Sequence, residues 1–161
     1  MSHPIGSELP DTLFGRLAGP VGDRPFLAVV VVTTDPAGWP HPALLSYGEV
    51  LALDLRRIRV AVAEASRTAA NLRRSGRITL GFIEAGTVYY VKATVRAEVR
   101  LGDRADLVGF EAAIETVLHD VPHPDEGGGA VVDGIRFAPR NSPEHLRHEW
   151  GAMLAHLRAT G

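Results

Sequence analysis

The chain has 161 residues, of which 45% are hydrophobic, and this length and composition are typical of one globular domain, predicted to span residues 1–161. It contains no cysteine, which excludes disulfides, thiolate catalysis and cysteine-ligated metal sites. A net charge of −2 argues against a general nucleic-acid binder, and the lack of a long apolar run or a signal-peptide pattern predicts a cytoplasmic protein with no membrane association.

The N-terminal third predicts a tail, a short helix and a hairpin. Residues 1–8 have no periodic pattern and are expected to form a loose tail. Leucine and phenylalanine at helical spacing predict a short helix over residues 11–17. The clearest strand is 26–34, whose continuous β-branched run predicts that both of its faces are covered. A turn rich in proline and glycine at 35–40 then leads into a second arm over 43–53.

The middle of the chain predicts three further strands and one helix. Alternating apolar residues predict a third strand over 57–63. The segment 66–75 reads as a helix, because it begins at a serine suited to N-capping and ends before a glycine. Strands over 77–83 and 87–100 follow, joined by a short loop that contains glycine.

The C-terminal third predicts helices at either end of one strand. Apolar residues three and four positions apart predict an amphipathic helix over 103–119. A sixth strand is expected over 130–138 and a final helix over about 143–158, with serine as its cap and proline in its first turn. Because hairpins dominate this order, we predict a mainly β fold, an antiparallel barrel with peripheral helices and a core over about 25–100.

A candidate anion site lies where the third predicted strand leads into the helix at 66–75. Ser66, Arg67 and Thr68 begin this helix, and a helix N-terminus presents unpaired N–H groups with a partial positive charge. Two hydroxyls and a guanidinium beside that end could hold a phosphate. The same residues also fit a simple capped helix with a solvated arginine, and Glu64 would oppose an anion unless it points away.

An ordered set of segments resembles the pyridoxamine 5′-phosphate oxidase-like, FMN-binding split-barrel proteins. The matching segments are 33–34, 38–42, 45–47, 66–68, 71–72, 77–80 and 90–92. The resemblance covers about 26–99, nearly half of the chain. It implies a six-stranded split barrel that forms a homodimer, with FMN bound at the interface between the two chains.

The resemblance also implies two groups of cofactor-binding residues. The group at the flavin phosphate and ribityl chain comprises Ser66, Arg67, Thr68, Asn71 and Lys92. The group along the isoalloxazine ring, in the second strand, comprises Leu45, Ser46 and Tyr47.

The function implied by this resemblance is that of a flavin-dependent oxidoreductase of unknown substrate. FMN would carry out the redox chemistry, with electrons from a reduced nicotinamide or a small organic substrate. No side chain stands out as an acid or base, so no catalytic residue is named. A matched set of metal ligands is not visible either, although His145, His148 and His156 share one side of the last helix. The alternatives are an F420-dependent reductase and a non-catalytic protein that binds flavin or haem.

Overall fold

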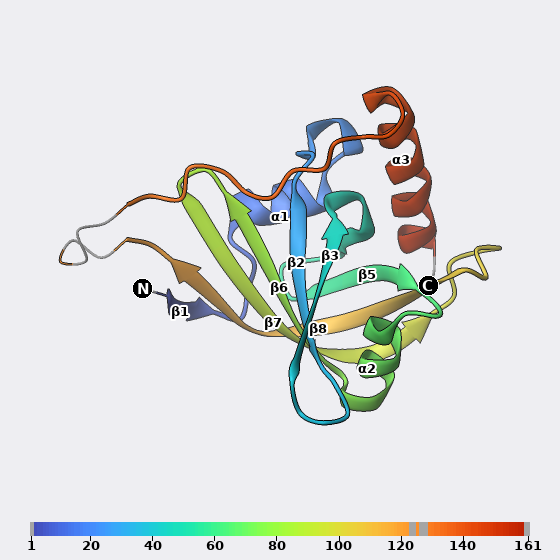
Figure 1. The fold of residues 1–161 in the computed structure, drawn as a ribbon, viewed down its shortest axis with the longest axis horizontal. Coiled ribbons are helices and arrows are strands. Elements are labelled where there is room, and N and C mark those ends of the chain that lie inside the picture. The colour runs from blue at the N-terminus through green and yellow to red at the C-terminus, as the bar shows by residue number, and fades with distance from the viewer. Residues whose placement is uncertain (1, 123–124, 126–128, 160–161) are drawn as a thin grey trace.

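The computed structural model describes residues 2–122, 125 and 129–159, and its main feature is a curled antiparallel sheet that forms an open half-barrel (Figure 1). The strands are β1 (Ser2–Gly6), β2 (Ala28–Thr34), β3 (Pro40–Ser46), β4 (Val50–Ala52), β5 (Arg57–Ala63), β6 (Arg77–Glu84), β7 (Thr87–Val99) and β8 (Leu107–Asp120). The helices are α1 (Asp11–Ala18), α2 (Arg67–Ser75) and α3 (Pro143–Ala159), with short 3₁₀ turns η1 (Val21–Asp23) and η2 (Tyr47–Glu49). The predicted class, a mainly β antiparallel split barrel with peripheral helices, is confirmed.

The strands follow the order β3-β2-β6-β7-β8-β5-β4, and β1 pairs with β8. The described residues therefore form eight paired strands, and the predicted number of six is wrong. One reason is that η2 divides the predicted second arm into β3 and β4. At this point Ser46 and Glu49 form a reciprocal capping box. The Ser46 side chain accepts from the backbone N–H of Glu49, and the Glu49 side chain accepts from the backbone N–H of Ser46.

The core lies on the inner side of the half-barrel, where alternate residues of the strands meet α1 and α2. Leu13 and Leu17 of α1 belong to the same buried cluster as Ala69 and Leu72 of α2. The two helices thus close the barrel with their apolar faces, because a sheet with one uncovered apolar face is unstable in water.

The boundaries of α2 confirm the prediction made from its capping residues. The Ser66 hydroxyl oxygen accepts a hydrogen bond from the backbone N–H of Ala69 at 3.1 Å. Gly76, at the other end, has a left-handed φ of 64°, a conformation that glycine adopts without steric cost.

The helix predicted over 103–119 is wrong, because this segment is the central strand β8. Val108, Phe110, Ala112 and Ile114 alternate into the core, as a strand requires. The register with β7 then shifts by one residue at Glu115, so that Val117 also faces inward. This bulge creates a spacing of three residues between buried positions, which imitates helical periodicity in the sequence.

Two predictions near the chain ends are also wrong. The expected tail contains β1, in which His3 lies opposite His119 of β8. The expected strand over 130–138 makes only one isolated bridge among the described residues, between Leu27 and Arg136. From Val29 onward, β3 and β6 already flank β2, so the segment can pair only with the residues that precede this point.

The two faces of β2 differ in burial within one chain. Val29 and Val31 point inward and are fully buried, whereas Val30 and Val32 on the outer face are only half-buried. Leu44, which lies opposite Val30 in β3, is 48% exposed. The prediction that both faces are covered therefore holds only for the inner face of the single chain.

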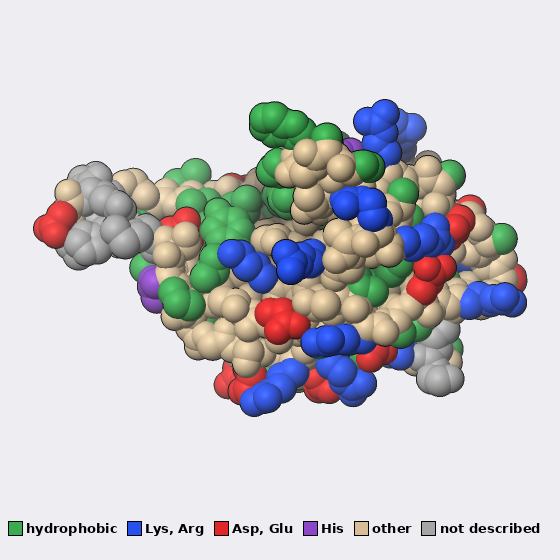
Figure 2. All heavy atoms as spheres, turned by 90° about the horizontal axis from the view of Figure 1, so that it is seen from below, with side chains coloured by type: hydrophobic (Ala, Val, Ile, Leu, Met, Phe, Trp, Pro, Cys, Tyr) green, Lys and Arg blue, Asp and Glu red, His purple; other side chains and the backbone are tan. Residues whose placement is uncertain are grey.

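Charged side chains of both signs are interspersed on the face shown in Figure 2. Surface ion pairs of the described residues include Arg57 with Asp54 at 2.8 Å and Arg96 with Glu115 at 3.1 Å. The described residues of the face in Figure 2 thus lack the single-sign patch typical of a nucleic-acid interface. Among all described residues, no helix has both the length and the apolarity needed to cross a membrane.

Candidate functional site

The start of α2, which follows β5 directly, presents the predicted anion-binding residues (Figure 1). Arg67 is the first residue of the helix, and its exposed guanidinium has no ion pair or hydrogen bond within the described part of the chain. Thr68 is buried, and its hydroxyl likewise has no described partner. Ser66 is half-buried and uses its oxygen as the cap acceptor, but its O–H remains able to donate.

Glu64, the acidic residue before this helix, is held by an arginine further along α2. The Arg73 guanidinium donates to both carboxylate oxygens of Glu64, at 2.7 and 2.8 Å, and also to Glu98 of β7. The hydrogen bonds that Arg73 donates to the carboxylates of Glu98 and Glu64 raise the pKa of Arg73, and the bond from Arg73 lowers the pKa of Glu98. Because Arg73 and Arg67 are six residues apart, they point about 120° away from each other around the helix. Glu64 is therefore paired on a different side of α2 from Arg67.

Asn71 has a structural partner that orients it away from the surface. It is 4% exposed, and its side-chain amide donates to the hydroxyl of Thr33 at 3.0 Å. This bond fixes α2 against the inner face of β2, near the end of that strand.

Lys92 lies on the opposite side of the sheet from α2. Its neighbours Val91 and Ala93 are buried in the core, so alternation directs Lys92 outward, where it is exposed. It pairs in register with Thr79 of β6. A single chain therefore does not bring Lys92 and Arg67 to the same face.

Leu45, Ser46 and Tyr47 lie at the end of β3 far from α2. Ser46 is opposite Ala28 at the beginning of β2, whereas α2 contacts Thr33 near the other end of β2, roughly 17 Å away along the strand. Leu45 and Tyr47 are buried in the core. The N–H and hydroxyl of Ser46 both donate to Glu49, at 2.6 and 2.8 Å. The structure does not bring these three residues together with the start of α2.

A polar network around Tyr47 was not found from the sequence. The Tyr47 hydroxyl donates to Glu84 of β6, and Glu84 also forms an ion pair with Arg16 of α1. Burial raises the pKa of Tyr47 to about 12, so it is a neutral donor at pH 7. The three residues are far apart along the chain and match no local motif. In the same described residues, no group of three or more potential metal ligands lies together.

No protein-family model matches the chain. A curated relative, the uncharacterized protein YclD of Bacillus subtilis (strain 168), is 31% identical over 150 residues, which make up 92% of this chain and 94% of YclD. The chain belongs to the YclD family. The match covers nearly the whole of both chains.

Solved structures similar to this YclD-family chain share its fold at low sequence identity. A candidate pyridoxamine 5′-phosphate oxidase from Lactobacillus delbrueckii has a TM-score of 0.56, with 16% identity, and covers 71% of this chain and 97% of its own. An FMN-binding protein from Syntrophomonas wolfei (67% and 86%) and an F420 reductase (68% and 98%) each have a TM-score of 0.53 and 14% identity. The predicted resemblance to pyridoxamine 5′-phosphate oxidase-like split barrels is thus confirmed in the fold.

Proposed function

We propose that this YclD-family protein binds FMN between two copies of the chain and acts as a flavin-dependent oxidoreductase. The observation that carries the proposal is the exposed Arg67 guanidinium at the first turn of α2, with no described partner. Proteins of the same fold named as FMN-binding and as F420 reductase support a flavin-type cofactor. When bound, FMN would supply the hydride- and electron-transfer chemistry.

The donor set at the start of α2 fits a phosphate monoester. Arg67 offers a charged, two-pronged donor, and the hydroxyls of Ser66 and Thr68 lie beside the partial positive charge of the helix end. Glu64 does not oppose the anion at this point, because Arg73 holds its carboxylate on a different side of α2 from Arg67. In the proposal, these groups hold the phosphate and leave the redox step to the flavin.

The proposal places the cofactor between two chains because of where Lys92 lies. In one chain Lys92 and Arg67 lie on opposite sides of the sheet. One ligand can therefore contact both a lysine ammonium and an arginine guanidinium only if Lys92 and Arg67 come from two different chains. The outer face beside Lys92 is apolar, with Val30, Val32 and Leu44 left partly exposed. Covering this face with a second copy would remove apolar surface from water and complete the burial that the sequence of β2 predicts.

A second candidate function is the binding of flavin without turnover, or of F420 or haem in its place. The observation that favours it is the burial of Leu45 and Tyr47, whose side chains contact the core. This burial leaves few groups of β3 and η2 able to contact an isoalloxazine ring and adjust its redox properties. Mass measurement of the ligand that co-purifies with the protein identifies the cofactor. Anaerobic addition of a reduced nicotinamide then separates a reductase, whose flavin colour bleaches, from a binding protein.

Replacing Arg67 with alanine is expected to weaken FMN binding about 10- to 150-fold, or about 1.5–3 kcal/mol, because a charged hydrogen bond to phosphate is lost. The dissociation constant is measured from the quenching of flavin fluorescence on titration with protein. Arg96→Ala is the matched control, since Arg96 is an exposed arginine paired with Glu115 on the sheet. An Arg67→Ala protein that binds FMN as tightly as the original would remove Arg67 from the site.

Replacing Leu44 with aspartate is expected to convert a dimer, with twice the 17.3 kDa chain mass, into a monomer. A charge at the centre of an apolar interface is costly to desolvate. The mass is measured by light scattering after gel filtration at micromolar concentration. Val132→Asp is the control, because Val132 is 86% exposed but lies in the segment before α3, outside the β2–β3 face. A wild-type chain that is monomeric under these conditions would contradict the shared site.

A further inference from the structure

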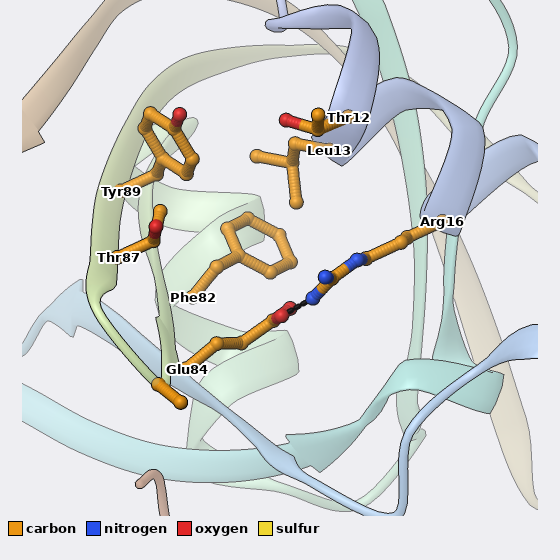
Figure 3. Close-up of a pocket in the computed structure, with 8 residues that line it drawn as sticks. Thr12, Leu13, Arg16, Phe82, Glu84, Thr87 and Tyr89 are labelled. Atoms are coloured by element: carbon orange, nitrogen blue, oxygen red, sulfur yellow. Dashed lines mark ion pairs between the residues drawn. The ribbon is translucent and has the colours of Figure 1, made fainter. Parts of the chain in front are cut away.

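A small cavity lies between α1 and the hairpin formed by β6 and β7, away from the start of α2 (Figure 3). Its volume is about 230 Å³, and Leu13 of α1 and Phe82 of β6 form its apolar part. Three hydroxyl groups also face it, from Thr12, Thr87 and Tyr89. The cavity therefore combines an aromatic surface with several short polar groups.

The three hydroxyls have no hydrogen-bond partner among the described side chains and backbone groups. They are thus free to bond a ligand or water in the cavity. The ring of Tyr89 is held in place by stacking on His119 of β8, with ring centroids 4.6 Å apart. A fixed ring at the wall of a cavity offers a flat surface of defined orientation.

One end of the cavity is formed by the ion pair between Arg16 and Glu84 (Figure 3). The Glu84 side chain is only 14% exposed, and it also accepts the hydrogen bond from buried Tyr47. The pair is neutral overall, yet it presents guanidinium N–H donors directly beside carboxylate acceptors. A charged ligand group would meet one favourable and one unfavourable charge at this end.

We propose that this cavity binds a small neutral aromatic or heteroaromatic ring that carries an amide edge. The carbonyl of an amide accepts from Arg16, and its N–H donates to Glu84, so both charged groups stay satisfied. The ring then packs beside Tyr89, because Phe82 is only 1% exposed. The volume equals the share of about eight liquid water molecules, which suits one ring with a single substituent. Nothing in this proposal depends on flavin binding at α2.

The ligand class is tested with three molecules of nearly the same shape, namely benzamide, benzoate and benzamidine. Binding to the full chain is measured by isothermal titration calorimetry at pH 7. Benzamide is expected to bind at least about tenfold more tightly than either charged analogue, because each of those leaves one member of the ion pair facing a like charge. A parallel titration with 2-pyridone, whose amide is part of the ring, is compared with that of benzamide, whose amide lies outside the ring. The tighter of the two shows which position of the amide the cavity prefers.

Two charge variants make the test specific to this end of the cavity. Glu84→Gln leaves Arg16 unpaired and is expected to shift the preference to benzoate, whereas Arg16→Gln leaves Glu84 unpaired and is expected to shift it to benzamidine. Glutamine at position 84 still accepts from Tyr47, so the fold is retained. Arg96→Gln, which alters an exposed arginine paired with Glu115 on the sheet, is expected to leave the order unchanged. The proposal would be overturned if benzamide showed no saturable binding, or if the three molecules ranked in the same order of affinity in every variant.

Discussion

Replacing Arg24 with methionine is expected to lower the free energy of unfolding by about 3–5 kcal/mol, the largest loss we predict for a polar residue. Arg24 is 3% exposed, and its guanidinium donates to the carbonyl oxygens of Tyr47 and Val50, each at 2.8 Å. It also donates to carbonyls at the end of α1, those of Leu17 in the last turn and of Gly19 at the C-cap. Methionine fills a similar volume but donates no hydrogen bond, so these carbonyls lose the guanidinium, and that of Tyr47 keeps only its bond from the Val50 N–H.

The role of Arg24 is unusual because its described partners are carbonyl oxygens and include no carboxylate. Burial lowers the pKa of Arg24 to about 10, so the side chain remains charged at neutral pH. One guanidinium thereby ties the end of α1 to η2 and β4. Lysine at this position is expected to restore only part of the stability, because an ammonium group cannot span the same set of acceptors.

Urea unfolding at pH 7 measures the effect of the Arg24 substitution. Arg96→Met is the control, because Arg96 is 60% exposed and a surface ion pair contributes little. The control is expected to change the free energy of unfolding by less than about 0.5 kcal/mol. A loss below about 1 kcal/mol for Arg24→Met would show that the carbonyl groups find other donors.

Replacing Gly48 with alanine is expected to destabilise the protein by about 3 kcal/mol, at the upper end for overpacking. A Cβ atom on Gly48 would lie 2.1 Å from Cγ of Trp150 in α3, far inside van der Waals contact. The backbone of η2 cannot shift easily, because Arg24 holds carbonyls on both sides of Gly48. Trp150 is also confined, since it is 5% exposed and packs on Phe26 with centroids 5.3 Å apart.

A double-mutant cycle tests whether this contact is the cause. Adding Trp150→Ala to Gly48→Ala removes the clash, so the combined loss is expected to be at least about 1 kcal/mol smaller than the sum of the single losses. Gly151→Ala is the matched control, because Gly151 lies in α3 with nothing near its Cβ position, and alanine favours helix. Additive losses in the cycle would mean that Gly48 is required for a reason other than Trp150.

The sequence by itself determined the elements whose signals are local. Ser66 and the glycine at 76 fix the ends of α2 through capping, and the alternation over 57–63 gives β5 with the predicted bounds. The position of Arg67 at the helix start follows from the same capping signal. These features depend on hydrogen bonds and side-chain patterns within a few residues, so they can be predicted without knowledge of the rest of the fold.

Only the tertiary structure decided which distant residues meet. The segment from Leu107 to Asp120 is a strand because β5 and β7 pair with it on both sides, and a bulge at Glu115 conceals its alternation. Likewise, Lys92 faces away from α2, and Tyr47 meets Glu84 inside the barrel. Strand pairing is a contact between segments far apart in sequence, and its hydrogen bonds outweigh local periodicity and set which face each side chain occupies.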